Sequence, residues 1–189
     1  MGSFGSGIDQ GVLQFVTRYP VRGFLVDLNS GAEFGFPMNP TTLQESIAVQ
    51  WNEQRVVGMS HPVLQYVGTG SHNLPGVSFL CDRHMMSRER NRDVSVKDFL
   101  GFKRFLQSLT VPPRGTESVA GGAPPRVLFV WPEVVSLIVV VKSVSFQHER
   151  FTQDGEPLRY VAQVTFSEIR DSRMTSEQLF NEGSIRSGF

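Results

Sequence analysis

The sequence has a single cysteine, Cys81, no long hydrophobic run and no excess of charge of either sign. One cysteine rules out a disulfide within the chain and is typical of a protein made in a reducing cytoplasm. The longest apolar run, residues 134–141, includes Ser136 and is far shorter than the roughly 18–20 residues that a membrane helix needs. The formal net charge is zero. We therefore expect no membrane span and no stable binding of nucleic acid.

The chain is 189 residues long, the size of one folded domain with short appendages. Residues 1–8 are rich in glycine and serine and lack a basic start, so we expect no secretory signal there. We expect an N-terminal arm over residues 1–19, one folded domain over residues 20–170 and a C-terminal arm over residues 171–189.

The most regular pattern lies in residues 134–169, where two strand-like runs flank the turn signal Gln153-Asp154-Gly155. Each run alternates apolar and polar side chains, as in an antiparallel hairpin with one buried face. A two-residue loop would set apolar side chains against polar ones, whereas a three-residue loop sets apolar against apolar: Val144 opposite Val164 and Phe146 opposite Ala162. Glycine suits the left-handed conformation at the last position of that loop. We predict the three-residue loop.

Shorter runs predict further strands, at residues 21–29, 32–36, 46–56, 63–67, 77–81 and 126–131. Residues 96–109 predict one helix, with Ser95 as its N-cap and an apolar stripe at helical spacing. The polar segment 82–93 is expected to be a loop, and Trp51 and Trp131 are expected to be buried in strands. The connections are too short for repeated βαβ units. We predict a mainly β protein, an antiparallel β-sandwich or barrel with one flanking α-helix and a long β-hairpin.

Outside these elements, three segments carry weaker predictions. Residues 11–19 are expected to form a short strand or helix, and residues 176–180 a helical turn. Residues 113–125 contain several glycines and prolines and are expected to form an exposed loop.

Candidate chemistry is sparse. Gly68-Thr69-Gly70 lacks the Lys-Ser/Thr ending of a phosphate-binding loop. Zinc needs three or four ligands held together, and Cys81 with His84, His72 and His61 does not show ligand spacing. The arginines of residues 83–92 are interleaved with acidic residues and have no aromatic platform for nucleic acid. We predict no catalytic residue, no metal and no cofactor.

Four segments, in this order, resemble the contractile injection system tube protein family. The segment Phe36–Ser46, with Asn39-Pro40-Thr41-Thr42-Leu43 at its centre, is similar to the family's strand-entry loop. Val67–Gly70 resembles its glycine loop, Pro124–Trp131 resembles one of its strands, and Phe151–Arg159 resembles its hairpin tip. The resemblance extends over residues 20–170.

The resemblance implies a structural role in the virion tail or in an extracellular injection particle, for a protein made in the cytoplasm of a bacterial host. It implies a β domain of the tail-tube type that forms a six-fold ring with copies of itself. We expect a tube initiator or adaptor at the tube–baseplate junction, in contact with adjacent tail-tube and baseplate or hub proteins. DNA or another cargo would pass through the lumen. Many family members also carry a peptidoglycan-binding LysM domain, which we do not expect in a chain that ends at Phe189.

The hairpin is the predicted contact with a neighbouring subunit, because exposed strand edges serve as joints between subunits. Its predicted interface residues are Val144, Phe146, Asp154, Gly155, Tyr160, Ala162 and Val164. Under the alternative, these strands lie at the centre of a monomeric sandwich. Two alternative functions are the main repeating tube subunit and, in a different class, a soluble carbohydrate- or peptidoglycan-binding module.

Overall fold

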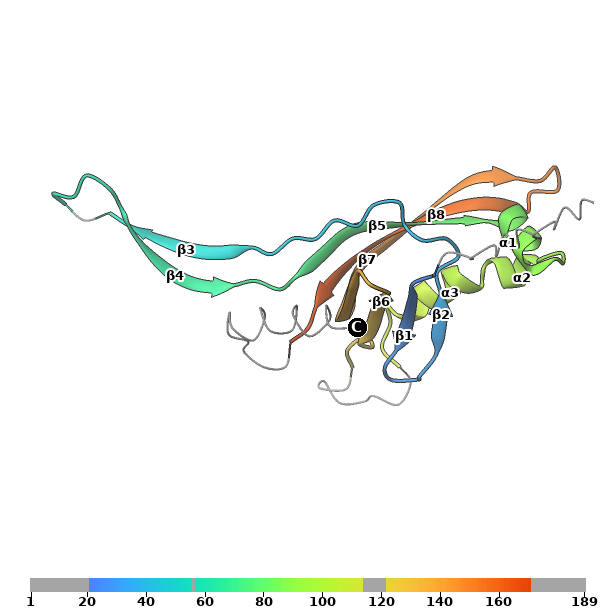
Figure 1. Ribbon diagram of the computed structural model, residues 1–189, viewed down its shortest axis with the longest axis horizontal. Helices are drawn as coiled ribbons and strands as arrows, with labels where there is room; N and C mark the ends of the chain where they lie inside the picture. Colours follow the sequence, from blue (N-terminus) through green and yellow to red (C-terminus); the bar gives the residue numbers. More distant parts are fainter. Residues whose placement is uncertain (1–20, 56, 114–121, 171–189) are drawn as a thin grey trace, which may run out of the picture.

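The computed structural model describes residues 21–55, 57–113 and 122–170 (Figure 1). Its strands are β1 (Phe24–Asp27), β2 (Glu33–Gly35), β3 (Val49–Gln54), β4 (Val63–Thr69), β5 (Asn73–Asp82), β6 (Val127–Trp131), β7 (Val135–Phe151) and β8 (Pro157–Glu168). Its helices are α1 (Arg83–Arg90), α2 (Val96–Phe99) and α3 (Gly101–Ser108). The predicted mainly β class is confirmed. The predictions for residues 11–19 and 176–180 lie outside the described residues.

The strands form one six-stranded antiparallel sheet and a separate two-stranded hairpin. The sheet has the order β2-β1-β6-β7-β8-β5, and β3 pairs with β4. β7 joins the two halves of the sheet, because its residues 135–139 pair with β6 and its residues from 139 onward pair with β8. The described strands are not closed into a barrel, so the barrel form of the prediction is not observed.

Aromatic side chains fill the space between the two halves of the sheet. The ring of Phe36 lies 4.9 Å from Phe79 on β5 and 5.5 Å from Phe129 on β6. The ring of Phe102 on α3 lies 5.3 Å from Phe34 on β2 and 5.4 Å from Phe79. Each such pair adds about 0.5–1.5 kcal/mol to the energy of apolar burial. Helix α3 therefore packs between the two edge strands of the sheet, β2 and β5.

The helix predicted over residues 96–109 is present as two segments, α2 and α3. The Ser95 side chain accepts a hydrogen bond from the amide of Asp98, as predicted for the N-cap. The break falls at Leu100, directly before Gly101, which lies against the ring of Phe34.

The predicted loop over residues 82–93 is wrong, because residues Arg83–Arg90 form helix α1. The Asp82 side chain caps this helix by accepting hydrogen bonds from two amides of its first turn, and Asn91 closes the other end in the left-handed conformation. Only Met86 of the helix is buried. The helix is therefore defined by its caps and not by an apolar stripe, which is the signal that the prediction required.

Asp82 also links three elements of the fold. It ends β5, caps α1 and pairs with Arg159 on β8 at 2.8 Å. Burial on its own would raise the pKa of the Asp82 carboxyl, but hydrogen bonds from Arg159 and the helix amides outweigh burial and lower that pKa. The stabilisation from this carboxylate is therefore present above the unfolded-state pKa and is lost as the pH falls through the folded-state pKa.

The register predicted for the long hairpin is confirmed. Val144 pairs with Val164 and Phe146 with Ala162. The loop is closed by a 2.8 Å hydrogen bond from the amide of Thr152 to the carbonyl of Glu156. Gly155 has a φ of 80°, the left-handed conformation that was predicted for it.

Candidate functional site

The hairpin of β3 and β4, with its turn, is called the arm here and extends away from the rest of the domain (Figure 1). Every residue of β3 is exposed, and so is every residue of β4 except Gly68. At about 3.3 Å per residue, the arm reaches roughly 35 Å from its root. A two-stranded hairpin without further contacts is at best marginally stable in water. The arm therefore needs a partner surface to become firmly ordered.

The two faces of the arm differ in chemistry. One face carries Val49, Trp51, Leu64 and Tyr66, which are 48%, 55%, 56% and 59% exposed, and also Glu53, which pairs with Leu64 toward the tip. The other face carries Gln50, Asn52, Gln54 and Gln65, with Val63 as its apolar exception. On the apolar face, the rings of Trp51 and Tyr66 meet edge-on across the two strands, 5.6 Å apart. Single exposed apolar side chains are ordinary, but a continuous row of them marks an interaction surface.

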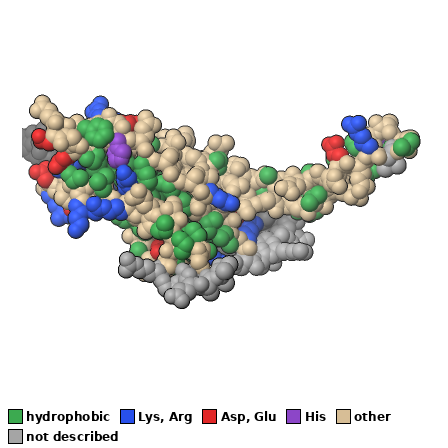
Figure 2. All heavy atoms as spheres, turned by 180° about the vertical axis from the view of Figure 1, so that it is seen from behind, with side chains coloured by type: hydrophobic (Ala, Val, Ile, Leu, Met, Phe, Trp, Pro, Cys, Tyr) green, Lys and Arg blue, Asp and Glu red, His purple; other side chains and the backbone are tan. Residues whose placement is uncertain are grey.

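The arm carries almost no charge along its strands. β4 contains no charged residue, and β3 contains one, Glu53. Figure 2 shows that the acidic and basic side chains of the arm gather near its tip. A partner surface for the middle of the arm is therefore selected by shape and apolar contact and not by ion pairs.

The root of the arm is held to the sheet by backbone and side-chain contacts. Ser46 and Asn73 exchange backbone hydrogen bonds of 2.9 and 2.8 Å where the arm meets β5. Beside them, His72 Nε2 lies 3.0 Å from Glu45 Oε2, and His72 Nδ1 lies 3.9 Å from Glu168 Oε2 on β8. These contacts connect both strands of the arm to the sheet and fix the direction in which the arm leaves it.

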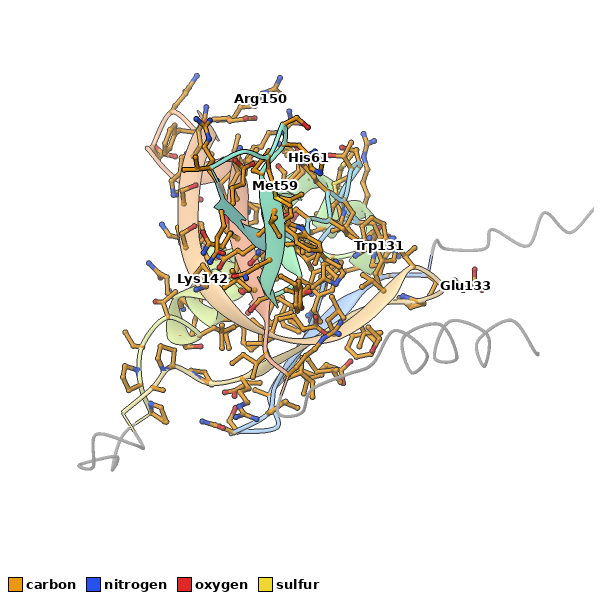
Figure 3. The ribbon with its side chains drawn as sticks, turned by 90° about the vertical axis from the view of Figure 1, so that its left-hand side faces the viewer. Met59, His61, Trp131, Glu133, Lys142 and Arg150 are labelled. Carbon is orange, nitrogen blue, oxygen red and sulfur yellow. The ribbon has the colours of Figure 1, made fainter. Side chains whose placement is uncertain are left out.

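A second feature is the open edge of β7. On the side of β6, only residues 135–139 of β7 are paired, so residues 140–151 have no neighbouring strand there. Among the described residues, no backbone hydrogen bond reaches this side of the segment. Lys142 and Arg150 mark its two ends in Figure 3. A row of unpaired N–H and C=O groups is a template for a strand from another chain.

The interface residues predicted from the sequence fall into three groups. Three are fully buried in the core of the same subunit: Tyr160, Ala162 and Val164. Two are partly buried and pack against that core: Val144 and Phe146. Two are exposed at the hairpin tip: Asp154 and Gly155. The side chains of Tyr160, Ala162 and Val164 are covered within their own subunit. The predicted subunit contact stays a prediction, and the other four residues are the ones with exposed surface for a neighbour.

The segment Asn39-Pro40-Thr41-Thr42-Leu43 holds the chain in place between β2 and the arm. Asn39 Oδ1 accepts a 3.1 Å hydrogen bond from the amide of Gly23, and Asn39 Nδ2 donates a 2.8 Å hydrogen bond to the carbonyl of Val21. Of the other members, Pro40 is buried, Leu43 packs against the core, and Thr41 and Thr42 are exposed. The segment thus has a structural role in this subunit.

Side chains considered for catalysis or metal binding do not converge in the part of the chain that the structure describes. Cys81 lies on β5 beside Tyr160, and burial raises the pKa of the Cys81 thiol to about 12. Burial also raises the pKa of Tyr160. His84 lies on α1 and His72 at the root of the arm, so the length of β5 (Asn73–Asp82) separates them. No cluster of three metal-ligating side chains occurs among the described residues.

We expect Cys81 to be inert in the folded protein, because only a thiolate reacts and this thiol is both fully buried and protonated at neutral pH. Native protein mixed with iodoacetamide at pH 8 should remain unlabelled over a time in which the urea-unfolded protein is fully labelled, as measured by intact mass. Labelling of both forms at the same rate would contradict the burial of this side chain.

The arginines of residues 83–92 belong to α1 and the turn after it, and two ion pairs connect this region to the rest of the domain. Arg83 lies 2.8 Å from Glu156 at the β7–β8 tip. Glu89 pairs with Arg22 near β1. Arg83 and Glu89 thus hold α1 against the domain.

His148, for which no catalytic role was predicted, has a structural contact. Its Nε2 lies 3.1 Å from Nζ of Lys103 on α3. Burial, and then the positive charge of Lys103, lower the pKa of His148. The imidazole therefore accepts a hydrogen bond from the lysine and joins α3 to β7.

Trp51 is the functional candidate that sequence reasoning missed. It was expected to be buried, but it is half exposed on the apolar face of the arm. Val49 and Trp51 alternate with polar residues. This pattern is the same whether the apolar face packs on the subunit's own core or is left exposed for a partner. The absence of charge in β4 was the available signal that this hairpin is not built to face water.

An unpartnered apolar hairpin and an open strand edge, on a mainly β domain without a cluster of catalytic groups in its described part, define a structural subunit that assembles with other chains. A protein-family model, that of the contractile injection system tube protein, matches residues 26–177 of the chain, which is more than half of its length. The protein belongs to this family of structural tube proteins, which places it in a tail or injection particle. No curated protein matches the chain. No described helix is long and apolar enough to cross a membrane.

Proposed function

We propose that this protein forms a six-fold ring at the junction between the tail tube and the baseplate of a contractile particle, as a tube initiator or adaptor. The arm is the observation that carries the proposal, because its apolar face is exposed and it reaches beyond its own domain. The arm and the open β7 edge are two different surfaces. Contacts between unlike surfaces are heterologous, and such contacts close into a ring when the rotation between copies fits.

The partners in this proposal are further copies of the chain, the adjacent tail-tube protein and the baseplate or hub protein. The described residues of the arm and the sheet are mostly uncharged. A wall of this kind would let DNA or another cargo pass without stable binding, because affinity for nucleic acid depends on neutralised phosphates.

The mass of the purified protein in solution tests the proposal, with negative-stain images of the same sample. We expect rings of six or stacks of such rings. A monomer that also fails to enter particles when it is co-expressed with its neighbouring tail proteins would overturn the proposal.

The second candidate is the main repeating tube subunit, which would use the same two surfaces. Copy number in purified particles separates the two functions. A few rings of the protein per particle indicate an adaptor, whereas copies that increase with tube length indicate the tube itself.

A candidate from a different class is a soluble carbohydrate- or peptidoglycan-binding module. The exposed ring of Trp51 favours it, since aromatic rings stack on sugars, and a monomer that sediments with purified peptidoglycan would support it. We place it below both structural functions because Trp51 is one member of a row of apolar side chains on the arm, which suits a protein partner.

A further inference from the structure

We propose that residues 171–189 of the chain cover an apolar patch on the outer face of the sheet, where β1, β6 and the first part of β7 lie side by side. The patch consists of the apolar side chains that point away from the core on these strands: Phe24, Val26, Leu128, Val130, Ile138 and Val140. The occupant is thus a segment of the same chain, and the inference does not depend on ring formation.

The strand ladders show that these side chains share one face. Phe24 pairs with Val130 and Val26 pairs with Leu128 between β1 and β6, and Leu128 pairs with Ile138 on β7. Paired residues point to the same side of a sheet, and neighbours along a strand point to opposite sides. The residues that alternate with the patch face the core: Leu25, Val127, Phe129, Leu137 and Val139.

The core and helix α3 lie on the other side of these strands. Among the described residues, no side chain of the patch packs against the core cluster. Ile138 is 42% exposed, and a Cβ added to Gly35, opposite Phe24, would meet no described atom within 4 Å. Figure 3 shows β7 curving around the core between Glu133 and Lys142, so the patch lies on the convex side of the sheet.

The patch differs from the rest of the same face. Beyond Val140 the face is polar, with Ser143 and Ser145 on β7 paired with Thr165 and Gln163 on β8. β6 and the centre of β1, in contrast, are apolar on both faces. Strands of this kind are typical of a sheet that is covered on both sides, whereas a polar face suits water. The patch therefore requires a cover that the polar part does not.

The chain leaves the sheet at the edge of this patch. The amide of Ile169 donates a 2.9 Å hydrogen bond to the carbonyl of Ile138. Glu168 pairs with Val139 on the core face, so the half-buried side chain of Ile169 lies on the face of the patch. Three strands spaced about 4.8 Å apart are roughly 10 Å wide, which a few residues of extended chain can cross. Residues 171–189 thus begin where the cover is needed and are long enough to reach across it.

The composition of residues 171–189 suits an apolar surface. Large apolar side chains recur among polar ones: Met174, Leu179, Phe180, Ile185 and Phe189. They are too few to form a core of their own, and their removal from water is favourable only against another apolar surface. The family match also continues to residue 177, past the end of β8 at Glu168. The start of this segment therefore belongs to the sequence that the tube family shares.

The other terminal segment, residues 1–20, joins the fold on the side of α1. The carbonyl of Val21 accepts a 2.8 Å hydrogen bond from Asn39, and Arg22 pairs with Glu89 on α1. These contacts direct the chain before β1 toward the helix and the loop after β2. The C-terminal segment is therefore the better placed of the two to cover the patch.

Thiol alkylation tests whether residues 171–189 cover the patch. Ser136 lies on the patch face, opposite Val130, and Ser136→Cys places a thiol there. This thiol can react with iodoacetamide only while the covering segment is lifted away, so its rate reports the uncovered fraction. We expect the rate to rise by at least about tenfold when Leu179→Ser and Phe180→Ser are added, because two apolar contacts of the segment are lost. Intact mass measures the rate.

Matched variants control for other effects. Gln178→Ser with Asn181→Ser changes polar positions of the same segment and should leave the rate unchanged. Ser145→Cys, on the polar part of the face, should react at one fast rate with or without the segment's apolar side chains. The buried Cys81 reports on folding, because a second label would reveal the loss of its burial. Ile138→Cys repeats the measurement at a second position of the patch.

Two results would overturn the inference. If Ser136→Cys and Ser145→Cys react equally fast in the otherwise unchanged chain, the patch is open. If Ser136→Cys remains slow after Leu179→Ser and Phe180→Ser, another element covers the patch: a second copy if protection is lost on dilution, and residues 1–20 if it is not. Single subunits and rings are separated by size and labelled separately. A lack of rings therefore counts against the proposed function alone, and a lack of protection in single subunits counts against this inference alone.

Discussion

Replacing Leu64 by glutamate should leave the subunit folded but stop it from assembling. Leu64 lies at the tip end of the apolar face of the arm, opposite Glu53 in the ladder, and is 56% exposed, so its own subunit does not bury it. In an assembled contact, covering a leucine contributes about 1.5–3 kcal/mol. Its loss, with an unpaired charge in its place, should weaken each contact by at least about tenfold to a hundredfold. Sedimentation velocity of the two proteins at the same concentration would measure the shift from rings to single subunits.

Val111→Glu is the matched control for this substitution. Val111 follows α3 and is also 56% exposed, so the chemical change and the starting exposure are alike, but the position is outside the arm. We expect this variant to assemble as the unchanged protein does. Normal rings from Leu64→Glu, or equal loss of rings from both variants, would contradict the role given to the arm. Equal melting temperatures for the three proteins would show that the effect is on assembly and not on folding.

Gly23→Ala should destabilise the fold itself. A Cβ at Gly23 would overlap Cε2 of Phe36 and lie 2.8 Å from the carbonyl oxygen of Val130. The phenylalanine is a core side chain packed on Phe79 and Phe129, and the carbonyl belongs to the backbone of β6, so neither can move freely. Overpacking of this kind costs about 1–3 kcal/mol, and more where backbone must shift. The midpoint of urea unfolding should fall accordingly, with an unchanged slope.

Gly35→Ala provides the comparison for this effect. Gly35 is on β2, opposite Phe24 in the ladder, and an added Cβ there meets no atom within 4 Å. Its unfolding midpoint should be unchanged or slightly higher, because alanine restricts the unfolded chain more than glycine does. If the two variants unfold at the same urea concentration, the close approach of Gly23 to Phe36 does not require glycine at position 23.

Patterns within short sequence segments predicted the long hairpin correctly. They failed where contacts between distant segments determine the structure. The register of β7 and β8 follows from alternation and from one glycine that must be left-handed, both of which are properties of short segments. Helix α1 depends on the cap from Asp82 and on ion pairs to distant residues such as Arg22, which leave no periodic trace in the sequence. The exposure of the arm depends on the absence of a covering element, and alternation alone cannot reveal that.

The residues of the candidate site show the same division. Asn39 was identified by resemblance, and its two hydrogen bonds explain why an asparagine suits that position. Tyr160, Ala162 and Val164 were assigned to an interface because they alternate on a long hairpin. The sequence did not show that α2 and α3 lie against that face, with the ring of Phe99 5.1 Å from that of Tyr160. Which face of a hairpin is free is a property of the whole fold.

The pairing order of the strands has a consequence for synthesis on the ribosome. β1 pairs with β6, and β5 pairs with β8. Both early strands therefore remain incompletely paired until segments much later in the chain have been translated. β1 with β2 and the two strands of the arm are the pairs that are complete early, because each consists of segments close in sequence. The two strands of the arm can thus meet before the sheet that will hold its root is made, although the isolated hairpin is only marginally stable. Nascent chains on neighbouring ribosomes of one messenger RNA would expose the apolar faces of their arms to each other. The distance between these ribosomes, or the binding of chaperones to the nascent chains, would therefore govern the yield of correctly assembled rings.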